Sequence, residues 1–229
     1  MSGTSRQLSA GLTKTECDKL GVCWLGSRHL GFPLDLKVDI RPAVNLDATE
    51  GYKYFDDDWN WLGQWCRRNV GHFYAIATRE AFPHKRRPGE SEMDRISRKY
   101  GTGHTEHYHH LIHLGHRTHT GELREKLRAA WKKRRRGNSV VVMKPANYGW
   151  QIDPVHGYRG SAFLYITKQR ESWEMHLPRI DRVTLQHGGH PGRVLGRRCK
   201  ISLNLDAAYR SNQFKDFTQH ELLYQENTQ

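Results

Sequence analysis

The sequence predicts an α+β fold, in which helices and strands follow one another around one core. A run of β-branched and aromatic residues at 72–82 ends at Pro83, as is typical of a buried strand. A second strand is predicted at 105–114. Apolar side chains at helical spacing predict helices before and after this pair of strands. The 229 residues suffice for one domain of ordinary size.

The other elements are predicted from spacing and from turn residues. In two segments apolar side chains recur every three or four residues, which predicts two amphipathic helices. A glycine follows each of them, Gly71 and Gly137, as is common after the end of a helix. Beyond the two strands above, the predicted elements are a helix at 57–69, a helix at 121–137, a strand at 139–143, a helix at 161–170 and a strand at 199–205.

These elements divide the chain into three parts. Residues 1–55 show no sustained period and are predicted to be an N-terminal arm of unknown role. Residues 56–210 hold the predicted elements and form the folded domain, and residues 211–229 form a polar tail. The charged, aperiodic segment 83–104 predicts a long loop between two strands.

Charge predicts the kind of partner. The chain has 37 Lys and Arg against 24 Asp and Glu, which gives +13 at pH 7 with neutral histidines. Such an excess is the electrostatic signature of a protein that binds polyanions, so nucleic acid is the expected partner. The sequence has no G-x-x-x-x-G-K-[ST] motif, so we expect no ATP-driven motor of this type.

Other features predict a cytoplasmic protein. None of the four cysteines has C-x-x-C spacing, which indicates neither a disulfide framework nor a cysteine zinc site. The polar start of the chain does not resemble a secretory signal, and no run of 18 apolar residues is present to span a membrane. We therefore expect a reducing compartment and no membrane partner.

The strand at 105–114 carries the densest group of histidines. Because side chains alternate between the two faces of a strand, His107 and His109 project together, while Tyr108 points to the other side and can anchor the strand in the core. Two imidazoles on one face can chelate a divalent ion and leave coordination positions open, as in catalytic metal sites. Taken alone, a His-x-His pair is also compatible with ordinary packing.

A third ligand is predicted on the neighbouring strand. Glu80 lies near the end of the strand at 72–82, and antiparallel pairing would bring its carboxylate toward the histidine pair. His84 and Glu106 are alternatives for this position. Two imidazoles and a carboxylate around an open ion suit Mg or Mn for phosphate chemistry, although raw affinity favours zinc or copper.

A candidate nucleophile lies about sixty residues further on. Tyr165 and Lys168 are three residues apart in the predicted helix, so they share a face. A phenol with its ordinary pKa near 10 is a poor nucleophile, and a nearby ammonium together with a polarised phosphate would activate it. Tyr158, seven residues earlier, is the alternative nucleophile.

The helix at 121–137 is strongly basic toward its end. A solvated helix terminus would tolerate such a run, but the net charge of the chain favours a surface that contacts phosphates. The residues predicted to bind nucleic acid are Arg124, Arg128, Lys132, Lys133, Arg134, Arg135 and Arg136.

These motifs carry a resemblance to a known family. The string HYHHLIHL resembles the histidine-hydrophobic-histidine motif of the HUH endonucleases, although His110 stands where that family usually has an aliphatic residue. The string YITK resembles the Tyr-x-x-Lys motif of their single-tyrosine rolling-circle replication initiators. The strand FYAIATREAF and the order of elements over roughly 57–170 are also similar.

The resemblance implies a fold and an activity. The fold would be a five-stranded antiparallel sheet with flanking helices. The activity would be metal-dependent nicking and joining of single-stranded or hairpin origin DNA through a 5′-phosphotyrosine link, with Tyr165 as nucleophile. A host helicase and polymerase would complete the replication of a plasmid or phage. A transposase or mobilisation relaxase with the same chemistry, or a non-catalytic basic DNA-binding regulator, is the alternative.

Overall fold

The computed structural model of the chain describes most of the predicted domain and part of the segments that flank it. The described residues are 8–9, 12–42, 48–82, 88–89, 105–115, 120–135, 139–146, 151–152, 159–160, 162, 166, 194–195 and 198–214. In chain order the elements are β1 (Leu8–Ser9), α1 (Lys14–His29), β2 (Leu36–Pro42), α2 (Ala48–Asn69), β3 (Ala75–Phe82), β4 (Thr105–Ile112), α4 (Thr120–Arg135), β5 (Ser139–Pro145), β6 (Gln151–Ile152), β7 (Arg159–Gly160), β8 (Val194–Leu195), β9 (Cys199–Ile201) and α7 (Leu203–Arg210).

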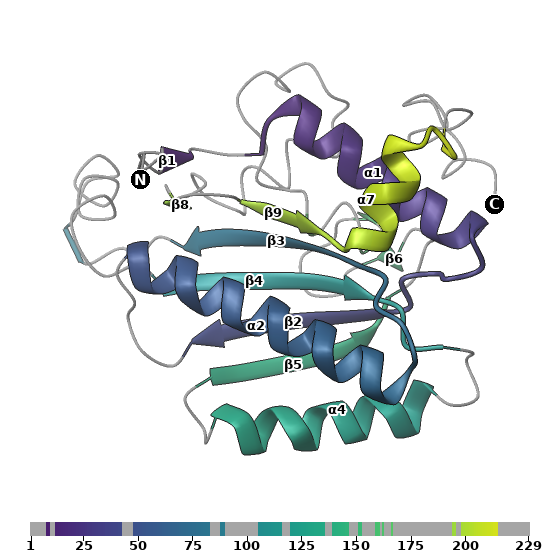
Figure 1. The fold of residues 1–229 in the computed structure, drawn as a ribbon. Coiled ribbons are helices and arrows are strands. Elements are labelled where there is room, and N and C mark those ends of the chain that lie inside the picture. The colour runs from purple at the N-terminus through teal and green to yellow at the C-terminus, as the bar shows by residue number, and fades with distance from the viewer. Residues whose placement is uncertain are drawn as a thin grey trace, which may run out of the picture.

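The predicted α+β fold is confirmed. Five strands form one antiparallel sheet in the order β5-β2-β4-β3-β9, so β2 and β3 flank the central strand β4 (Figure 1). Helices α2 and α4 pack on one face of this sheet, and α1 and α7 pack on the other. The strands β1 with β8, and β6 with β7, form two separate short antiparallel pairs.

The face under α2 and α4 holds the larger apolar core. On β2, Leu36, Val38 and Ile40 alternate with polar residues and are fully buried against this side. Helix α2 contributes apolar side chains at helical spacing, among them Phe55 and Leu62. This packing fixes which face each strand residue occupies, because a slip of one residue would expose every buried side chain of the strand.

Among the described residues, helices α1 and α7 cover part of the opposite face. Helices α1 and α7 pack over the β9, β3 and β4 side of the sheet, where Ile76, Leu111 and Leu205 share a second apolar cluster (Figure 1). Close packing of these helices requires Gly26, because a Cβ at this position would lie 2.5 Å from the ring of Phe214. The strand residues in this second cluster come from β3, β4 and β9.

Residues 1–55, for which the sequence predicts no element, contain α1 and β2. Helix α1 begins with a capping box, in which Thr13 and Glu16 each bond the backbone of the other. Strand β2 is the second strand of the sheet, and its short alternation of Leu36, Val38 and Ile40 is the sequence signal for it. The predicted arm thus supplies part of the sheet.

Two predicted elements differ most from the structure in their bounds. The helix predicted at 57–69 begins earlier, at Ala48, and ends at Asn69. The strand predicted at 199–205 ends at Ile201, and Leu203 begins helix α7. Ile201, Leu203 and Leu205 fit the period of a strand, but Leu203 is 83% exposed while Leu205 and Ala208 are buried, which is the spacing of a helix.

Of the helix predicted at 161–170, the structure describes Ala162 and Ile166, and both are helical. The loop predicted at 83–104 and the tail predicted at 211–229 fall largely outside the described residues. None of the helices in the described part of the chain is long and apolar enough to cross a membrane.

Tyr108 anchors the central strand, and its hydroxyl can be tested. The buried Tyr108 hydroxyl donates to the carbonyl oxygen of Gly51 in α2 at 3.0 Å. Tyr108→Phe removes this bond and should lower the free energy of unfolding by about 1 kcal/mol in urea denaturation. Tyr74→Phe is the control, because the Tyr74 ring stacks on Phe32 and keeps that contact, so it should change stability little. Equal losses in the two variants would contradict the anchoring role.

Candidate functional site

Buried polar side chains from three neighbouring strands meet on the α1 side of the sheet. His107 and His109 of β4 point to this side, as alternation predicts. Antiparallel pairing places Glu80 of β3 directly opposite His107, and Thr78 opposite His109. On the other flank Asp39 of β2 is the partner of His109. Cross-strand neighbours lie about 5 Å apart at their Cβ atoms, so the register itself assembles this group.

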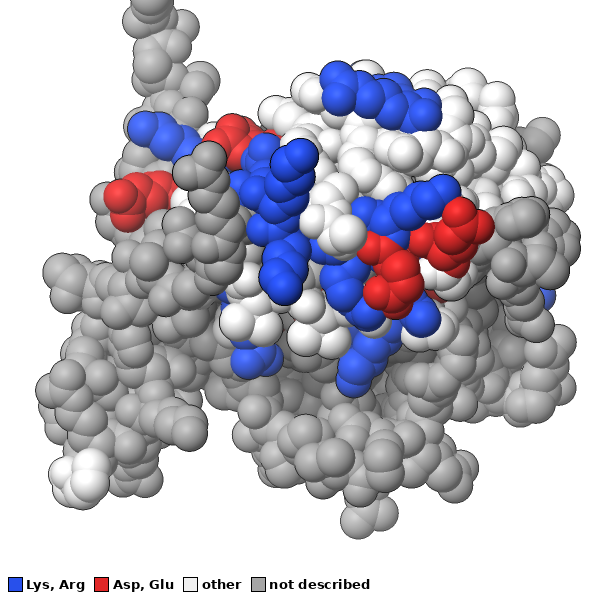
Figure 2. Space-filling view, turned by 90° about the horizontal axis from the view of Figure 1, so that it is seen from below, with Lys and Arg blue, Asp and Glu red and all other residues white. Residues whose placement is uncertain are grey.

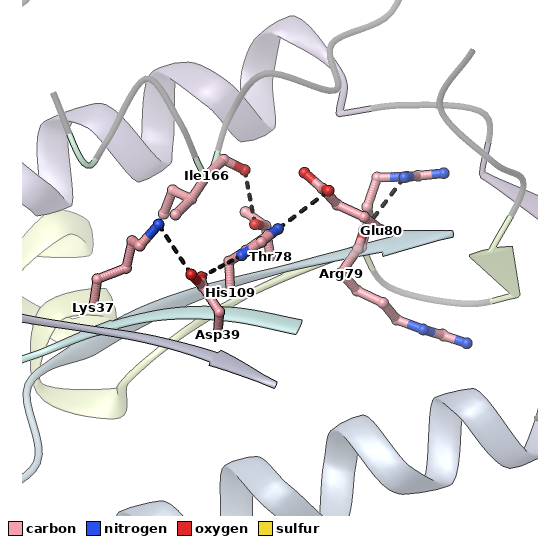
Figure 3. Close-up of polar contacts among 8 residues, drawn as sticks. Lys37, Asp39, Thr78, Arg79, Glu80, His109 and Ile166 are labelled. Carbon is pink, nitrogen blue, oxygen red and sulfur yellow. Dashed lines mark hydrogen bonds and ion pairs between the residues drawn. The ribbon is translucent and has the colours of Figure 1, made fainter. Parts of the chain in front are cut away.

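His109 lies between two carboxylates. Its Nδ1 is 2.6 Å from Oδ1 of Asp39, and its Nε2 is 3.1 Å from Oε2 of Glu80 (Figure 3). Asp39 in turn is 3.0 Å from Nζ of Lys37. The His109 imidazole on β4 is thus held by one carboxylate from β2 and one from β3.

The charge of this group favours an ionised Asp39. Burial by itself would raise the pKa of Asp39, but the hydrogen bond and positive charge of His109, with the ammonium of Lys37, lower the pKa below its ordinary value. Asp39 is therefore a carboxylate over the whole physiological pH range. It orients the imidazole so that Nε2 faces Glu80.

The burial of the group is unusual for ionisable residues. Glu80 and His109 are each 1% exposed, and His107 is 4% exposed. Burying charges costs folding free energy that a paired network offsets only in part, and apolar residues of similar volume would often be as stable or more so. Ionisable groups gathered in this way are candidates for a functional site.

Donor types and spacing at His109 and Glu80 fit a divalent ion. Two ligands at right angles around an ion, each about 2.1 Å from it, are about 3 Å apart. The 3.1 Å between Nε2 of His109 and Oε2 of Glu80 matches this separation. Imidazole ligates a metal in its neutral form, through a ring nitrogen that carries no proton.

His107 is not placed as a third ligand beside His109 and Glu80. Its ring centroid lies 6.3 Å from that of His109, and within the described part of the chain no three His, Cys, Asp or Glu side chains are placed to hold a metal ion together. His107 is paired with Glu80 across β3 and β4, so the two side chains leave neighbouring backbone positions on the same face.

The chain next to the predicted nucleophile reaches this same face. The Thr78 hydroxyl donates to the carbonyl oxygen of Ile166 at 2.7 Å, and Ile166 is buried in the cluster with Leu111 (Figure 3). Tyr165 precedes Ile166 in the sequence. Tyr165 and Lys168 themselves lie outside the described residues, as does Tyr158.

The alternatives for the third ligand are less informative. His84 lies outside the described residues, and Glu106 is described only in its backbone. In the backbone, Glu106 precedes His107 and pairs with Ala81 of β3.

His110, the departure from the family motif, belongs to the core under α2. Its ring lies 6.0 Å from the centroid of Phe55 and 6.2 Å from that of Trp59. Complete burial lowers the pKa of His110 to about 3, so this imidazole is neutral at pH 7. It therefore packs as an uncharged core residue in the position where an aliphatic side chain is usual.

The basic helix is described over most of its length. Several of its cations have carboxylate partners: Arg124 and Arg128 both contact Glu125, at 3.5 and 2.7 Å. Lys132 and Lys133 are exposed. The side chain of Arg135 and the whole of Arg136 lie outside the described residues.

Arg134 is used within the fold. Its Nη2 donates to the carbonyl oxygen of Asp57 at 3.2 Å and lies 3.5 Å from Oδ1 of the buried Asp58. The guanidinium also lies over the Trp61 ring, 5.3 Å from its centroid. Arg134 therefore links α4 to α2.

The basic helix and the histidine pair lie on opposite faces. Helix α4 packs on the α2 side through Leu127 and Trp131, beside the edge strand β5 (Figure 1). Seen from below, Lys and Arg side chains gather in the middle of this side of the molecule, with carboxylates beside them (Figure 2). A strand of DNA that touched both features would pass around β5.

Comparison with protein-family models, with curated proteins and with solved structures finds no match to this chain.

The sequence motifs predict no role for Asp39. It lies in the part of the chain without a predicted element, and no family string includes it. The available signal was the alternation of β2, which puts Lys37, Asp39 and Arg41 on the face opposite Val38.

Asp39 should support metal binding without ligating the ion. Asp39→Ala leaves the imidazole unoriented and should weaken Mn²⁺ binding by about ten- to a hundredfold, measured by calorimetry and by the electron paramagnetic resonance of free Mn²⁺. Asp39→Asn should lose less, because the amide oxygen still accepts from Nδ1. Asp206→Ala on α7, which breaks an ion pair with Lys19 of α1, is the control and should leave Mn²⁺ binding unchanged. Loss of stability in Asp39→Ala with no Mn²⁺ binding by the unmodified protein would identify a purely structural network.

Proposed function

We propose that this chain is a metal-dependent DNA nickase of the HUH endonuclease class, most similar to the single-tyrosine initiators of rolling-circle replication. One observation carries the proposal. The register of β2, β3 and β4 gathers His107, His109 and Glu80 on one face, and Ile166, next to Tyr165, is hydrogen-bonded to Thr78 of that face.

In this proposal His107, His109 and Glu80 hold a divalent ion, Mg or Mn. When bound, the ion supplies positive charge that polarises the scissile phosphate. Asp39 keeps the His109 imidazole oriented, and burial of the group excludes water from its ligands.

The Tyr165 hydroxyl oxygen attacks phosphorus and loses its proton. A phosphorus–oxygen bond to the tyrosine forms as the bond to the 3′ oxygen breaks, and that oxygen leaves as a hydroxyl after it takes up a proton. One phosphodiester bond replaces another, so the step needs no ATP and can run backward to rejoin strands. Lys168 assists by its charge, since an ammonium near the phenol favours the phenolate.

The expected partner is single-stranded or hairpin DNA at a replication origin. The formal charge of +13 and the exposed Lys132 and Lys133 support binding to phosphates. Unwinding and synthesis would fall to a host helicase and polymerase, in keeping with the lack of a P-loop motif. A transposase or mobilisation relaxase would use the same site for other DNA.

A non-catalytic DNA-binding regulator is the second candidate. It is favoured by the contacts of His109 with Asp39 and Glu80, which already form a closed ionic group, and by the position of the His107 ring. Such a protein would bind DNA without covalent attachment.

Covalent attachment distinguishes the two. Single-stranded DNA from the replicon that encodes the chain, labelled at the 3′ end, should yield a protein–DNA adduct that survives a denaturing gel, because the tyrosine keeps the downstream strand. Tyr165→Phe should abolish the adduct while DNA affinity, measured by fluorescence anisotropy, stays within about twofold. Tyr158→Phe is the matched control and should still form the adduct. If the adduct is lost with Tyr158→Phe and retained with Tyr165→Phe, the nucleophile is misassigned.

Metal dependence tests the ligands. Chelation should stop adduct formation, and Mg²⁺ or Mn²⁺ should restore it. His107→Ala and Glu80→Gln should each reduce the rate by about a hundredfold or more and weaken Mn²⁺ binding in parallel. His110→Leu, on the other face of the same strand, should do neither. Equal losses in all three variants would indicate general destabilisation rather than a metal site.

A further inference from the structure

The sheet has an open area beside the candidate site. Within the described residues, helices α1 and α7 cover the β4, β3 and β9 side of this face, while on β5 Val140 and Val142 are 58% and 40% exposed. Met143 of the same strand is buried under α2 and α4, so the two valines point to the face that carries His109. Exposed valines side by side on a sheet are uncommon without a partner to cover them.

Cations border these valines. Lys144 of β5 and Arg41 of β2 are both exposed and share the face of the valines by alternation. In the register of the two strands Arg41 is the direct neighbour of Val140, and Lys37 is that of Lys144. We call Arg41, Val140, Val142 and Lys144 the β5 strip.

The strip is continuous with the candidate site. Val142 is paired with Asp39 across β2 and β5, and Asp39 bonds His109 across β2 and β4. Neighbouring strands are about 4.8 Å apart, so the strip lies about two strand spacings from the histidine. An extended ligand that crossed the sheet from His109 over β2 would reach Val140 and Val142 of β5.

We propose that the β5 strip binds single-stranded DNA on one side of the phosphate to be cut. This rests on the proposed function for the position of that phosphate. The sugar and base faces of one or two nucleotides pack on Val140 and Val142, and the ammonium and guanidinium groups pair with their phosphates. The combination of an apolar surface and flanking cations is what sequence-tolerant binding of unpaired strands uses.

A second copy of this chain is the competing occupant. β5 is an edge strand, and an exposed edge can pair with the same edge of another molecule. Lys144 and Pro145 at one end of β5 argue against this, because charged residues and proline on an edge strand discourage such pairing. The positive charge of the strip instead complements a polyanion.

Two independent pairs of substitutions test the strip. The affinity of each variant for short 3′-labelled single-stranded DNA is measured by fluorescence anisotropy at several salt concentrations. Val140→Glu with Val142→Glu should weaken binding about tenfold or more. Arg41→Ala with Lys144→Ala should lower the slope of log affinity against log salt by about 1.4, or about 0.7 for each lost phosphate contact.

The controls match the chemistry at other places. Leu203→Glu introduces an acid at an apolar residue of α7 that is 83% exposed, more than either valine. Lys126→Ala with Arg210→Ala removes two exposed cations that already pair with Glu122 and Asp206. The lysine–arginine control should leave the salt slope unchanged, and Leu203→Glu should change affinity less than twofold.

The outcomes separate the strip from the proposed function. If both pairs bind DNA like their controls, the strip is not a DNA surface, whatever the adduct assay shows. If the valine pair turns a concentration-dependent dimer into a monomer and leaves DNA affinity unchanged, the strip covers a second copy and the proposal is overturned. If binding falls as expected but the unmodified chain forms no adduct, the strip stands and the nickase function fails.

Discussion

The antiparallel register of β2, β4 and β3 is the constraint on which the candidate site depends. It places Asp39 and Thr78 on either side of His109, and Glu80 opposite His107, whatever rotamers the side chains adopt. The register is held from the other face, where the buried Tyr108, Val38 and Ala77 cannot shift by one residue without leaving the core. The apolar packing under α2 thus determines the geometry of the polar group.

Burying the ionisable side chains of the candidate site costs folding free energy. Glu80, His107 and His109 occupy the middle of a sheet face that apolar side chains could fill with less loss of solvation. Ionisable residues at positions where apolar side chains would pack are expected at functional sites. His109 and Glu80 bring an imidazole and a carboxylate within 3.1 Å of each other, and this pair is why we propose a metal-dependent activity.

The two faces of the sheet differ in how they are covered. One is closed by α2 and α4, with Arg134 joining the two helices through Asp58 and the Trp61 ring. The other is closed over β3, β4 and β9, while Val140 and Val142 on β5 remain exposed. The exposed valines and the buried polar group therefore lie on the same face of the sheet, with β2 between them.

The sequence alone determined the local features of this protein. Alternation in β4 assigned His107 and His109 to one face and Tyr108 to the other, and the step of four through Leu123, Leu127 and Trp131 determined α4. Such periods depend only on backbone geometry, so they can be recognised without knowledge of partners.

Tertiary structure decided what depends on pairing across the chain. Asp39 lies 70 residues from His109, in a strand too short to show a strong period, and only the strand order makes them neighbours. The same holds for Arg134, whose charge is paired with Asp58 of α2, and for the end of β9, where Ile201, Leu203 and Leu205 fit a strand until packing exposes Leu203. Strand order and register arise from the burial of one whole face at once, and no local pattern encodes them.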